Sequence, residues 1–196
     1  PKLSPIQVVI VPIYKNEDQL NIISNYARIL KRKLSELNIS VKFDDDDNKK
    51  PGWKFAEYEM KGVPLRIAVG PRDMENKTVE LARRDNLTKS IVAQEGLPKL
   101  LLETLDKIQE ELFSKASLFL NENTTQVNSI DQMNQILNTK GGFVEAFWNG
   151  DSNSEQKIKD LTKATIRCIP LEGSENGNCV LTGEPNSKKV IFARAY

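Results

Sequence analysis

The sequence of 196 residues predicts an α/β fold in two parts, a larger domain at the start of the chain and a small α+β unit at its end. Short apolar segments rich in β-branched residues alternate with helical stripes at the start, as in layered α/β domains. From Leu97 the apolar period becomes helical, and after Gly141 short strands return. We therefore expect a first domain over residues 1–100, connecting helices over 101–138 and a second domain over 139–196.

The first three predicted elements form a strand–helix–strand unit. Residues 6–13, "IQVVIVPI", are a continuous apolar run that suits a strand covered on both faces. A single helical stripe of apolar residues runs from Glu17 to Leu37, and residues 39–43, "ISVKF", predict the second strand. A helix that connects two strands favours parallel pairing.

Three more strands are predicted before the long helix, which gives a mixed sheet of five strands with about three helices. Pro51 suits the first position of a short helix that ends at Gly62. Residues 64–70, "PLRIAVG", predict a buried strand followed by a turn. The segments 77–84 and 88–92 read as two strands joined by a tight turn, a plausible hairpin.

The second half of the chain begins with a long amphipathic helix. Apolar residues recur every three to four positions from Leu97 to Phe119, and a further helical stretch reaches Leu137. Gly141 and Gly142 suit a helix stop. The tail then predicts a strand, a helix and two strands, over residues 143–148, 154–163, 165–170 and 189–196.

The composition excludes several kinds of site. Without any histidine, Ser-His-Asp and Cys-His catalysis are impossible within the chain, and Cys168 and Cys179 are too few for a Cys/His zinc tetrad. A disulfide between them is possible, but two reduced thiols in a cytosolic protein fit better. The net charge of +1 gives no bulk positive field, so contact with nucleic acid requires a local arrangement.

The length of the apolar runs and the first residue also carry information. No run approaches the roughly 20 residues that cross a bilayer, and no signal peptide opens the sequence. Pro1 stands where a methionine would begin a complete protein, so we expect a fragment of something longer.

Four consecutive aspartates at residues 44–47 raise the possibility of a metal site. They lack the alternating spacing of a calcium loop, and two lysines follow at once, so a solvated loop is the preferred interpretation. The basic clusters at residues 31–33 and 83–84 are interpreted as solvated faces. No nucleophile is paired with a base, so the chain alone is not expected to be a catalyst, and a small-molecule α/β enzyme is disfavoured.

Glu59, Arg66 and Arg72 are the side chains that suggest recognition. They follow one another at intervals of seven and six residues, at a predicted helix end, strand and turn. A carboxylate accepts hydrogen bonds and a guanidinium donates them, while guanine presents donors on its Watson–Crick edge and the acceptors O6 and N7 on the other. These side chains could enclose splayed-out guanines, and ordinary surface ion pairing is the alternative.

Residues 51–73, "PGWKFAEYEMKGVPLRIAVGPRD", closely resemble the anticodon-binding domain of prolyl-tRNA synthetases of the type shared by archaea, eukaryotes and some bacteria. "VVIVPIY" resembles the first strand of that domain, and "TIRCIP", "NCVLTG" and the terminal "FARAY" resemble the C-terminal extension of the family. The resemblance implies an anticodon-binding domain, a long helix and a C-terminal domain. It also implies that the catalytic domain of this class II synthetase, which handles ATP, magnesium and proline, lies outside the chain.

The same resemblance implies the site residues and the partners. Glu59, Arg66 and Arg72 would read the guanines of the proline anticodon, with Lys89 as a further contact, and Tyr196 would bring its terminal carboxylate near the active site of the parent enzyme. The implied partners are tRNA(Pro), the enzyme's own catalytic domain and a second copy in a cytoplasmic homodimer. The alternative is a stand-alone adaptor that reuses the fold to bind proteins.

The sequence departs from the pattern of the family in the C-terminal domain. Many members bind a structural zinc there through four cysteines. Asn149, Ser154 and Thr182 stand at three of those positions in this sequence, and only Cys179 remains, since Cys168 is not at a ligand position. We therefore expect neither zinc nor any other cofactor in this part of the enzyme.

Overall fold

The structure is a computed structural model that describes residues 1–171 and 176–195. The chain divides into two compact units, Pro1–Phe113 and Ser114–Tyr196, with the division inside helix α4 (Leu97–Glu122). The expected boundaries, 1–100, 101–138 and 139–196, differ from this division. The expected connector is shared between the units, because Leu101 and Leu105 pack in the first core and Met133 packs in the second.

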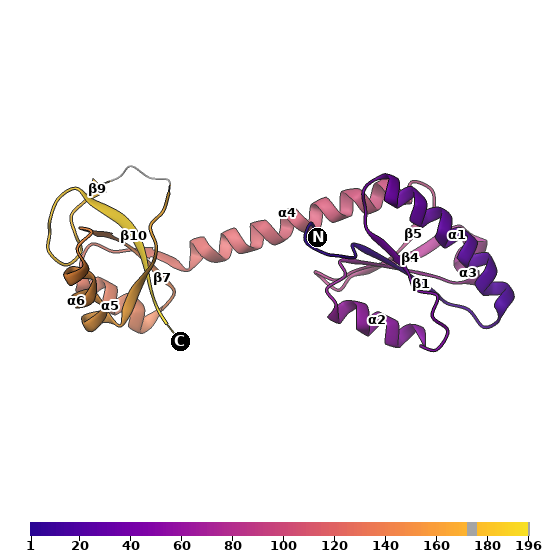
Figure 1. Cartoon of the computed structure of the whole chain (residues 1–196), viewed down its shortest axis with the longest axis horizontal. Helices are drawn as coiled ribbons and strands as arrows, with labels where there is room; N and C mark the ends of the chain where they lie inside the picture. Colours follow the sequence, from indigo (N-terminus) through magenta and orange to yellow (C-terminus); the bar gives the residue numbers. More distant parts are fainter. Residues whose placement is uncertain (172–175, 196) are drawn as a thin grey trace. The chain divides into compact units, whose positions relative to one another are not determined.

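The first unit contains the predicted mixed sheet of five strands (Figure 1). In space the order is β2-β1-β3-β4-β5. β1 pairs parallel with β2 and β3, and the remaining pairs are antiparallel, so both the strand–helix–strand unit and the hairpin are confirmed. The strands are β1 (Val8–Pro12), β2 (Val41–Phe43), β3 (Leu65–Val69), β4 (Thr78–Arg83) and β5 (Lys89–Ala93).

Helices cover both faces of this sheet. α1 (Glu17–Glu36) and the first half of α4 pack on one face, and α2 (Pro51–Met60) packs on the other (Figure 1). A third helix, α3 (Pro71–Asn76), forms where only a turn was expected. Pro71 occupies its first position, and the Asp73 carboxylate accepts a hydrogen bond from the Gly70 amide at 2.9 Å, which together begin a helix at the end of β3.

Side-chain alternation along the strands divides the core into two layers. The face towards α1 and α4 buries Leu65, Ile67 and Val69 of β3. The face towards α2 buries Val9 and Val11 of β1 together with residues from the α2 segment. Because successive side chains of a strand point to opposite faces, Arg66 is directed to the α2 side of the sheet.

The first residue of the aspartate run is not solvated, which corrects the interpretation of residues 44–47 as a wholly exposed loop. Asp44 is 8% exposed and accepts a hydrogen bond from the Tyr58 hydroxyl at 2.9 Å. Lys54, which is 1% exposed, places its Nζ 3.3 Å from Oδ1 of Asp44 and donates to the Asp44 carbonyl at 2.9 Å. The other three aspartates of the run are exposed, as expected.

Only the first half of the predicted amphipathic stripe of α4 is buried. The apolar residues up to Ile108 lie in the core of the first unit, whereas Leu112, Phe113 and Phe119 are exposed. The helix has 26 residues and rises about 39 Å, while a strand of five residues spans about 17 Å. The sheet is therefore too short to cover the whole stripe.

The second unit is built on a sheet in the order β6-β7-β10-β8. β6 pairs parallel with β7, and the other neighbours are antiparallel. Two short strands, β6 and β9, were not expected from the sequence. The elements are β6 (Thr124–Gln126), α5 (Ile130–Thr139), β7 (Phe143–Trp148), α6 (Ser152–Thr162), β8 (Ala164–Cys168), β9 (Asn176–Gly177) and β10 (Ser187–Arg194).

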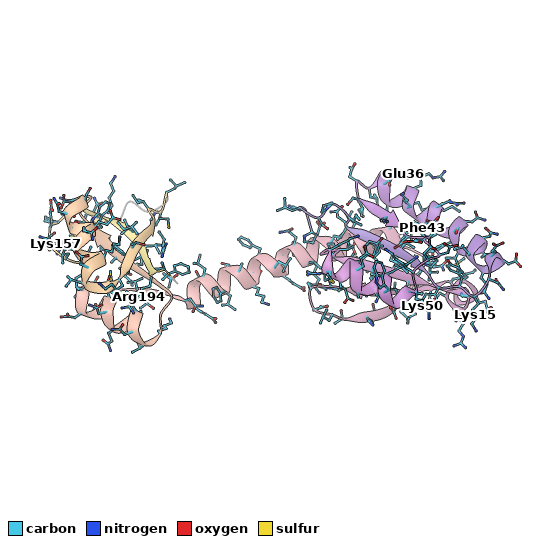
Figure 2. The ribbon with its side chains drawn as sticks, turned by 60° about the horizontal axis from the view of Figure 1, so that its bottom comes forward. Lys15, Glu36, Phe43, Lys50, Lys157 and Arg194 are labelled. Carbon is cyan, nitrogen blue, oxygen red and sulfur yellow. The ribbon has the colours of Figure 1, made fainter. Side chains whose placement is uncertain are left out.

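Arg194 joins the last strand of the second unit to its helices (Figure 2). Its Nε donates to the Thr162 carbonyl at 2.8 Å and its Nη1 to the Leu137 carbonyl at 3.2 Å. These bonds satisfy carbonyls near the ends of α6 and α5 that have no partner within the helix. Tyr196, for which a role near the active site was expected, lies outside the described residues. Within the described part of the chain, none of the helices has the length and apolar character needed to cross a membrane.

Candidate nucleic-acid interface

Arg66 is a buried charge on the α2 face of the first sheet. It is 5% exposed, and its Nη1 donates a hydrogen bond to Oε1 of Glu80 on β4 at 3.0 Å. Its Cζ lies 3.6 Å from the centroid of the Phe55 ring on α2. The ring covers one face of the guanidinium and the carboxylate takes one end, so neighbours on two elements fix its orientation.

Two donors of Arg66 remain unused. Among the described residues, neither Nε nor Nη2 has a hydrogen-bond partner, although both atoms are buried. Arg66 lines a small hollow of about 10 Å³ between α2 and the end of β4. Buried N–H groups without a partner are rare, so these two point to a water or a ligand that completes the site.

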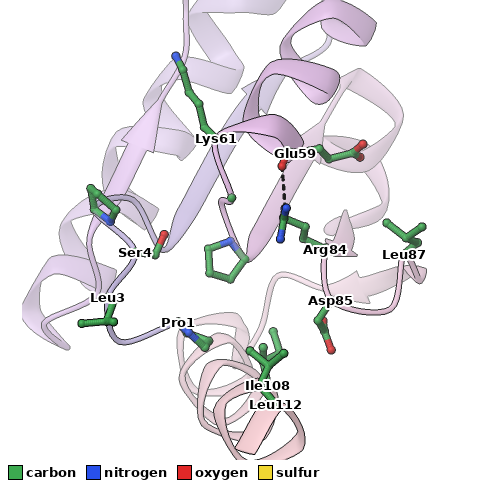
Figure 3. A pocket seen from close by; sticks show the side chains of 13 residues that line it. Pro1, Leu3, Ser4, Glu59, Lys61, Arg84, Asp85, Leu87, Ile108 and Leu112 are labelled. Atoms are coloured by element: carbon green, nitrogen blue, oxygen red, sulfur yellow. Dashed lines mark hydrogen bonds between the residues drawn. The ribbon is translucent and has the colours of Figure 1, made fainter. Parts of the chain in front are cut away.

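Glu59 lies beside this hollow, near the C-terminal end of α2. Its backbone carbonyl accepts a hydrogen bond from Nε of Arg84 at 2.6 Å, and Figure 3 shows its carboxylate extending away from that bond. The Glu59 side chain is exposed, so the carboxylate is accessible to a ligand. A wider hollow of about 700 Å³ begins at the same point and is lined in part by Arg84 and Leu87 (Figure 3).

Lys89 lies on the same face of the sheet as Arg66. Ala82 of β4 is paired with Arg66 on one side and with Lys89 on the other. Residues directly opposite one another in a sheet point to the same face, so the three form one row across β3, β4 and β5. Lys89 is exposed on the edge strand, where its ammonium can reach an approaching anion.

Arg72 lies apart from this row. It is exposed at the start of α3, beyond the carboxyl end of β3, and lines a separate hollow of about 390 Å³ with Tyr14 and Lys15. The hollow lies where the parallel strands β1 and β3 end, the edge at which open α/β sheets bind ligands. Tyr14 offers an aromatic surface there, and the exposed Lys15 extends from the unit (Figure 2).

The structure thus brings Glu59 and Arg66 to one hollow, aligns Lys89 with Arg66 and places Arg72 in another hollow. Sequence reasoning missed Phe55 and Glu80, which hold Arg66. A signal existed for each: Phe55 is one helical turn before Glu59, and Glu80 alternates with Ala82 on the predicted strand. Neither signal shows which charge the residue contacts.

Comparison with known proteins identifies the family. The family described as "Anticodon binding domain" matches residues 7–104, and the family described as "Prolyl-tRNA synthetase, C-terminal" matches residues 130–196. The chain belongs to the prolyl-tRNA synthetase family. It is similar to proteins named Proline--tRNA ligase from Flavobacterium johnsoniae (55% identical), Christiangramia forsetii (53%) and Porphyromonas gingivalis (52%).

These alignments include all of this chain but only 40% of each of the three relatives. The chain therefore corresponds to the C-terminal part of a prolyl-tRNA synthetase, as the resemblance implied. The row of Arg66, Ala82 and Lys89 and the Arg72 hollow both lie within the part of the synthetase chain that matches the anticodon-binding family.

The four positions at which the family resemblance implied zinc ligands in other members lie together in the second unit. Ser154 is 2% exposed, and its Oγ donates to Oδ1 of Asn149 at 2.6 Å. Burial alone would raise the pKa of the Cys179 thiol, but hydrogen bonds from Thr182 and from backbone amides, including that of Asn149, hold this pKa below its ordinary value. Hydrogen bonds therefore join the four positions to one another.

This arrangement leaves few ligands for a cation. In the described residues, no group of three or more His, Cys, Asp or Glu side chains could hold a metal ion. Cys168 is exposed on β8, Cys179 is buried, and both are free thiols. Asn149 also donates from Nδ2 to Oε2 of Glu184 at 2.8 Å, so both the nitrogen and the oxygen of its side-chain amide form hydrogen bonds.

Proposed function

We propose that this chain reads the anticodon guanines of proline tRNA, as the tRNA-binding part of an enzyme that joins proline to that tRNA with ATP. The observation that carries the proposal is the buried Arg66, with two unused donors beside the exposed carboxylate of Glu59. A guanidinium fork and a carboxylate match the acceptor and donor edges of guanine. Lys89 adds a cationic contact for the tRNA backbone, and Arg72 adds one for a second base.

The rest of the enzyme supplies the chemistry. The chain spans 40% of the length of its relatives, so ATP, magnesium and proline are assigned to the remaining part. We infer from the resemblance that the full enzyme is a cytoplasmic homodimer, and sedimentation of the full-length protein would check its mass. The role of the Tyr196 carboxylate near the active site stays a prediction, which deletion of Tyr196 in the full-length enzyme would test.

Arg72→Ala in the full-length enzyme is expected to weaken binding of proline tRNA by about 1–3 kcal/mol, the range for a good bidentate contact to a base. Arg72 is exposed, so the melting temperature should stay unchanged. Filter binding at one fixed salt concentration would compare proline tRNA with a transcript whose anticodon guanines are replaced by cytosine.

Lys33→Ala is the matched control, because Lys33 is an exposed cation on α1 in the same unit. Lys33→Ala should weaken tRNA binding less than Arg72→Ala does. Its effect should appear mainly in the salt dependence of binding, as is usual for phosphate contacts. Equal affinity of Arg72→Ala and wild type would contradict the assignment of Arg72. Equal affinity of the wild type for the two transcripts would contradict anticodon reading and favour the adaptor alternative.

We also infer that the second unit holds its fold without zinc. The cluster of Asn149, Ser154, Cys179 and Thr182 is joined by hydrogen bonds, and the apolar core beneath it includes Ile158 and Phe192. Treatment with a chelator should leave the melting temperature unchanged, whereas a zinc-dependent domain would unfold. Elemental analysis that finds about one zinc per chain would contradict this inference.

A further inference from the structure

We propose that Trp53, on the outer side of α2, is a stacking platform for one unpaired base of the anticodon loop other than the guanines. The inference rests on the proposed function and adds a second contact surface to it, away from the hollow beside Arg66. The observations that support it are the exposure of the indole, the lysine that lies over its ring and the balance of charges around it.

The outer side of α2 carries a stripe of residues that the sheet does not bury. Trp53, Glu57 and Met60 share this stripe, because residues four and seven positions apart lie on one side of a helix. Trp53 is 48% exposed and Met60 is 87% exposed, whereas Tyr58 of the same helix is buried against the sheet (Figure 1). Tryptophan is enriched at binding surfaces, so this stripe is a candidate contact area.

Lys49 orders the indole before any ligand arrives. Its Nζ lies 3.7 Å from the centroid of the Trp53 ring and 3.6 Å from Oε2 of Glu57. Lys61, one helical turn after Glu57, pairs with the other oxygen of that carboxylate. An indole that is already held in place loses less conformational entropy when a base stacks on it. Because Lys49 is exposed, a ligand can displace its ammonium from the ring at small cost.

The charges around Trp53 decide between a base and a phosphate as its ligand. The segment from Asp45 to Lys61 contains five carboxylates and, apart from the buried Lys54, three ammonium groups. A phosphate gains little from a surface with this balance of charge. The face of a base is uncharged, and stacking on an aromatic ring needs no positive field. The segment therefore favours contact with a base over contact with the tRNA backbone.

The position of Trp53 on α2 makes the partner an RNA loop that also reaches Glu59. Six positions separate the two residues, which corresponds to a rise of about 9 Å along the helix axis. They lie on different sides of α2, with Trp53 on the outer stripe and Glu59 beside the small hollow. One loop can therefore place a guanine at Glu59 and a different base on Trp53. Stacking accepts any base, so this contact adds affinity without selecting the base.

The test measures binding of the full-length enzyme to anticodon stem-loops of proline tRNA in which each unpaired nucleotide in turn lacks its base. At one position other than the guanines, we expect loss of the base to weaken binding about tenfold, as is typical of a base stacked on an aromatic side chain. Any of the four bases at that position should bind with similar affinity. Trp53→Ala should bind the unmodified stem-loop about tenfold less tightly and should no longer respond to loss of that base. Trp53→Phe, which keeps an aromatic ring, should retain most of the response.

Salt dependence and a matched variant provide the controls. Loss of one phosphate contact lowers the slope of log affinity against log salt concentration by about 0.7–0.9, whereas Trp53→Ala should leave this slope unchanged. Phe113→Ala removes an aromatic side chain that is 72% exposed in the same unit but lies on α4, and it should leave the affinity unchanged. If Trp53 only stabilised the fold, Trp53→Ala would weaken binding of all the stem-loops by the same factor. Melting curves of each variant check that the unit is folded.

Three outcomes would overturn the inference. They are a response to base loss that is the same in wild type and Trp53→Ala at every position, a lower salt slope in Trp53→Ala, and an equal loss of affinity in Phe113→Ala. If a stem-loop with cytosines in place of the guanines binds the wild type as well as the unmodified one does, the proposed function fails too. If the guanines are required but no response to base loss depends on Trp53, only the present inference fails.

Discussion

Asp44→Asn is expected to lower the free energy of unfolding of the first unit by about 3–5 kcal/mol, the usual cost of removing one partner from a buried ion pair. Lys54 is 1% exposed, and its Nζ lies 3.3 Å from Oδ1 of Asp44. Asparagine keeps the shape of the side chain but leaves the ammonium without a counter-charge. Urea titration followed by Trp53 fluorescence, in a Trp148→Phe background, would report on this unit.

The neighbouring aspartates provide the control. Asp45 is exposed, so Asp45→Asn should change the free energy of unfolding by less than about 0.5 kcal/mol. The double variant Asp44→Asn with Lys54→Met should recover much of the loss, because an apolar chain then replaces the unpaired charge. Equal effects of the substitutions at Asp44 and Asp45 would show that the buried pair does not stabilise the unit.

The same carboxylate predicts a dependence on pH. Burial alone would raise the pKa of Asp44, but the hydrogen bond from Tyr58 and the charge of Lys54 hold this pKa below its ordinary value. The pKa is lower in the folded than in the unfolded state, so the stabilisation is complete above about pH 4 and is lost as the pH falls through the folded value. The difference between wild type and Asp44→Asn should therefore shrink in acid. A difference that stays constant would assign the effect to another group.

The fold was predictable where local pattern decides the structure. The apolar run at residues 6–13, the amphipathic stripe from Glu17 and the alternation in "PLRIAVG" each predicted an element that the structure contains. The strands β6 and β9 were missed because each has at most three residues and too few side chains to show a period. The helix α3 was missed because a proline after a glycine fits a turn as well as a first helical position.

The candidate site was predictable as a set of residues but not as a geometry. Glu59 and Arg66 could be named from the sequence, because they stand at a predicted helix end and on a predicted strand, whereas Lys89 was implied only by the family resemblance. The burial of Arg66 depends on the packing of α2 across the sheet, which brings Phe55 over it. Long-range contacts of this kind leave no periodic signal, and for the same reason four identical aspartates do not show that only Asp44 is buried.

Gly142→Ala is expected to destabilise the second unit by about 3 kcal/mol or more, which combines backbone strain with a steric clash. Gly142 has a φ of +84°, and a Cβ there would lie 2.5 Å from the backbone oxygen of Asn123. That oxygen accepts a hydrogen bond from the Phe143 amide at 2.8 Å, where β6 and β7 begin their parallel pairing. It cannot move aside without breaking this pairing.

Gly150→Ala is the control that separates the backbone part of this effect from the steric part. Gly150 has the same φ of +84°, but nothing lies within 4 Å of the position that its Cβ would take. Gly150→Ala should therefore lower the free energy of unfolding only by the cost of the left-handed backbone, about 1 kcal/mol. Trp148 fluorescence in a Trp53→Phe background would follow urea unfolding of both variants, because Trp148 donates a hydrogen bond to Ser154 inside this unit. If the two substitutions destabilise the unit equally, the Asn123 carbonyl can move away from the new methyl group at no cost in stability. The start of the β6–β7 pair would then not be rigid.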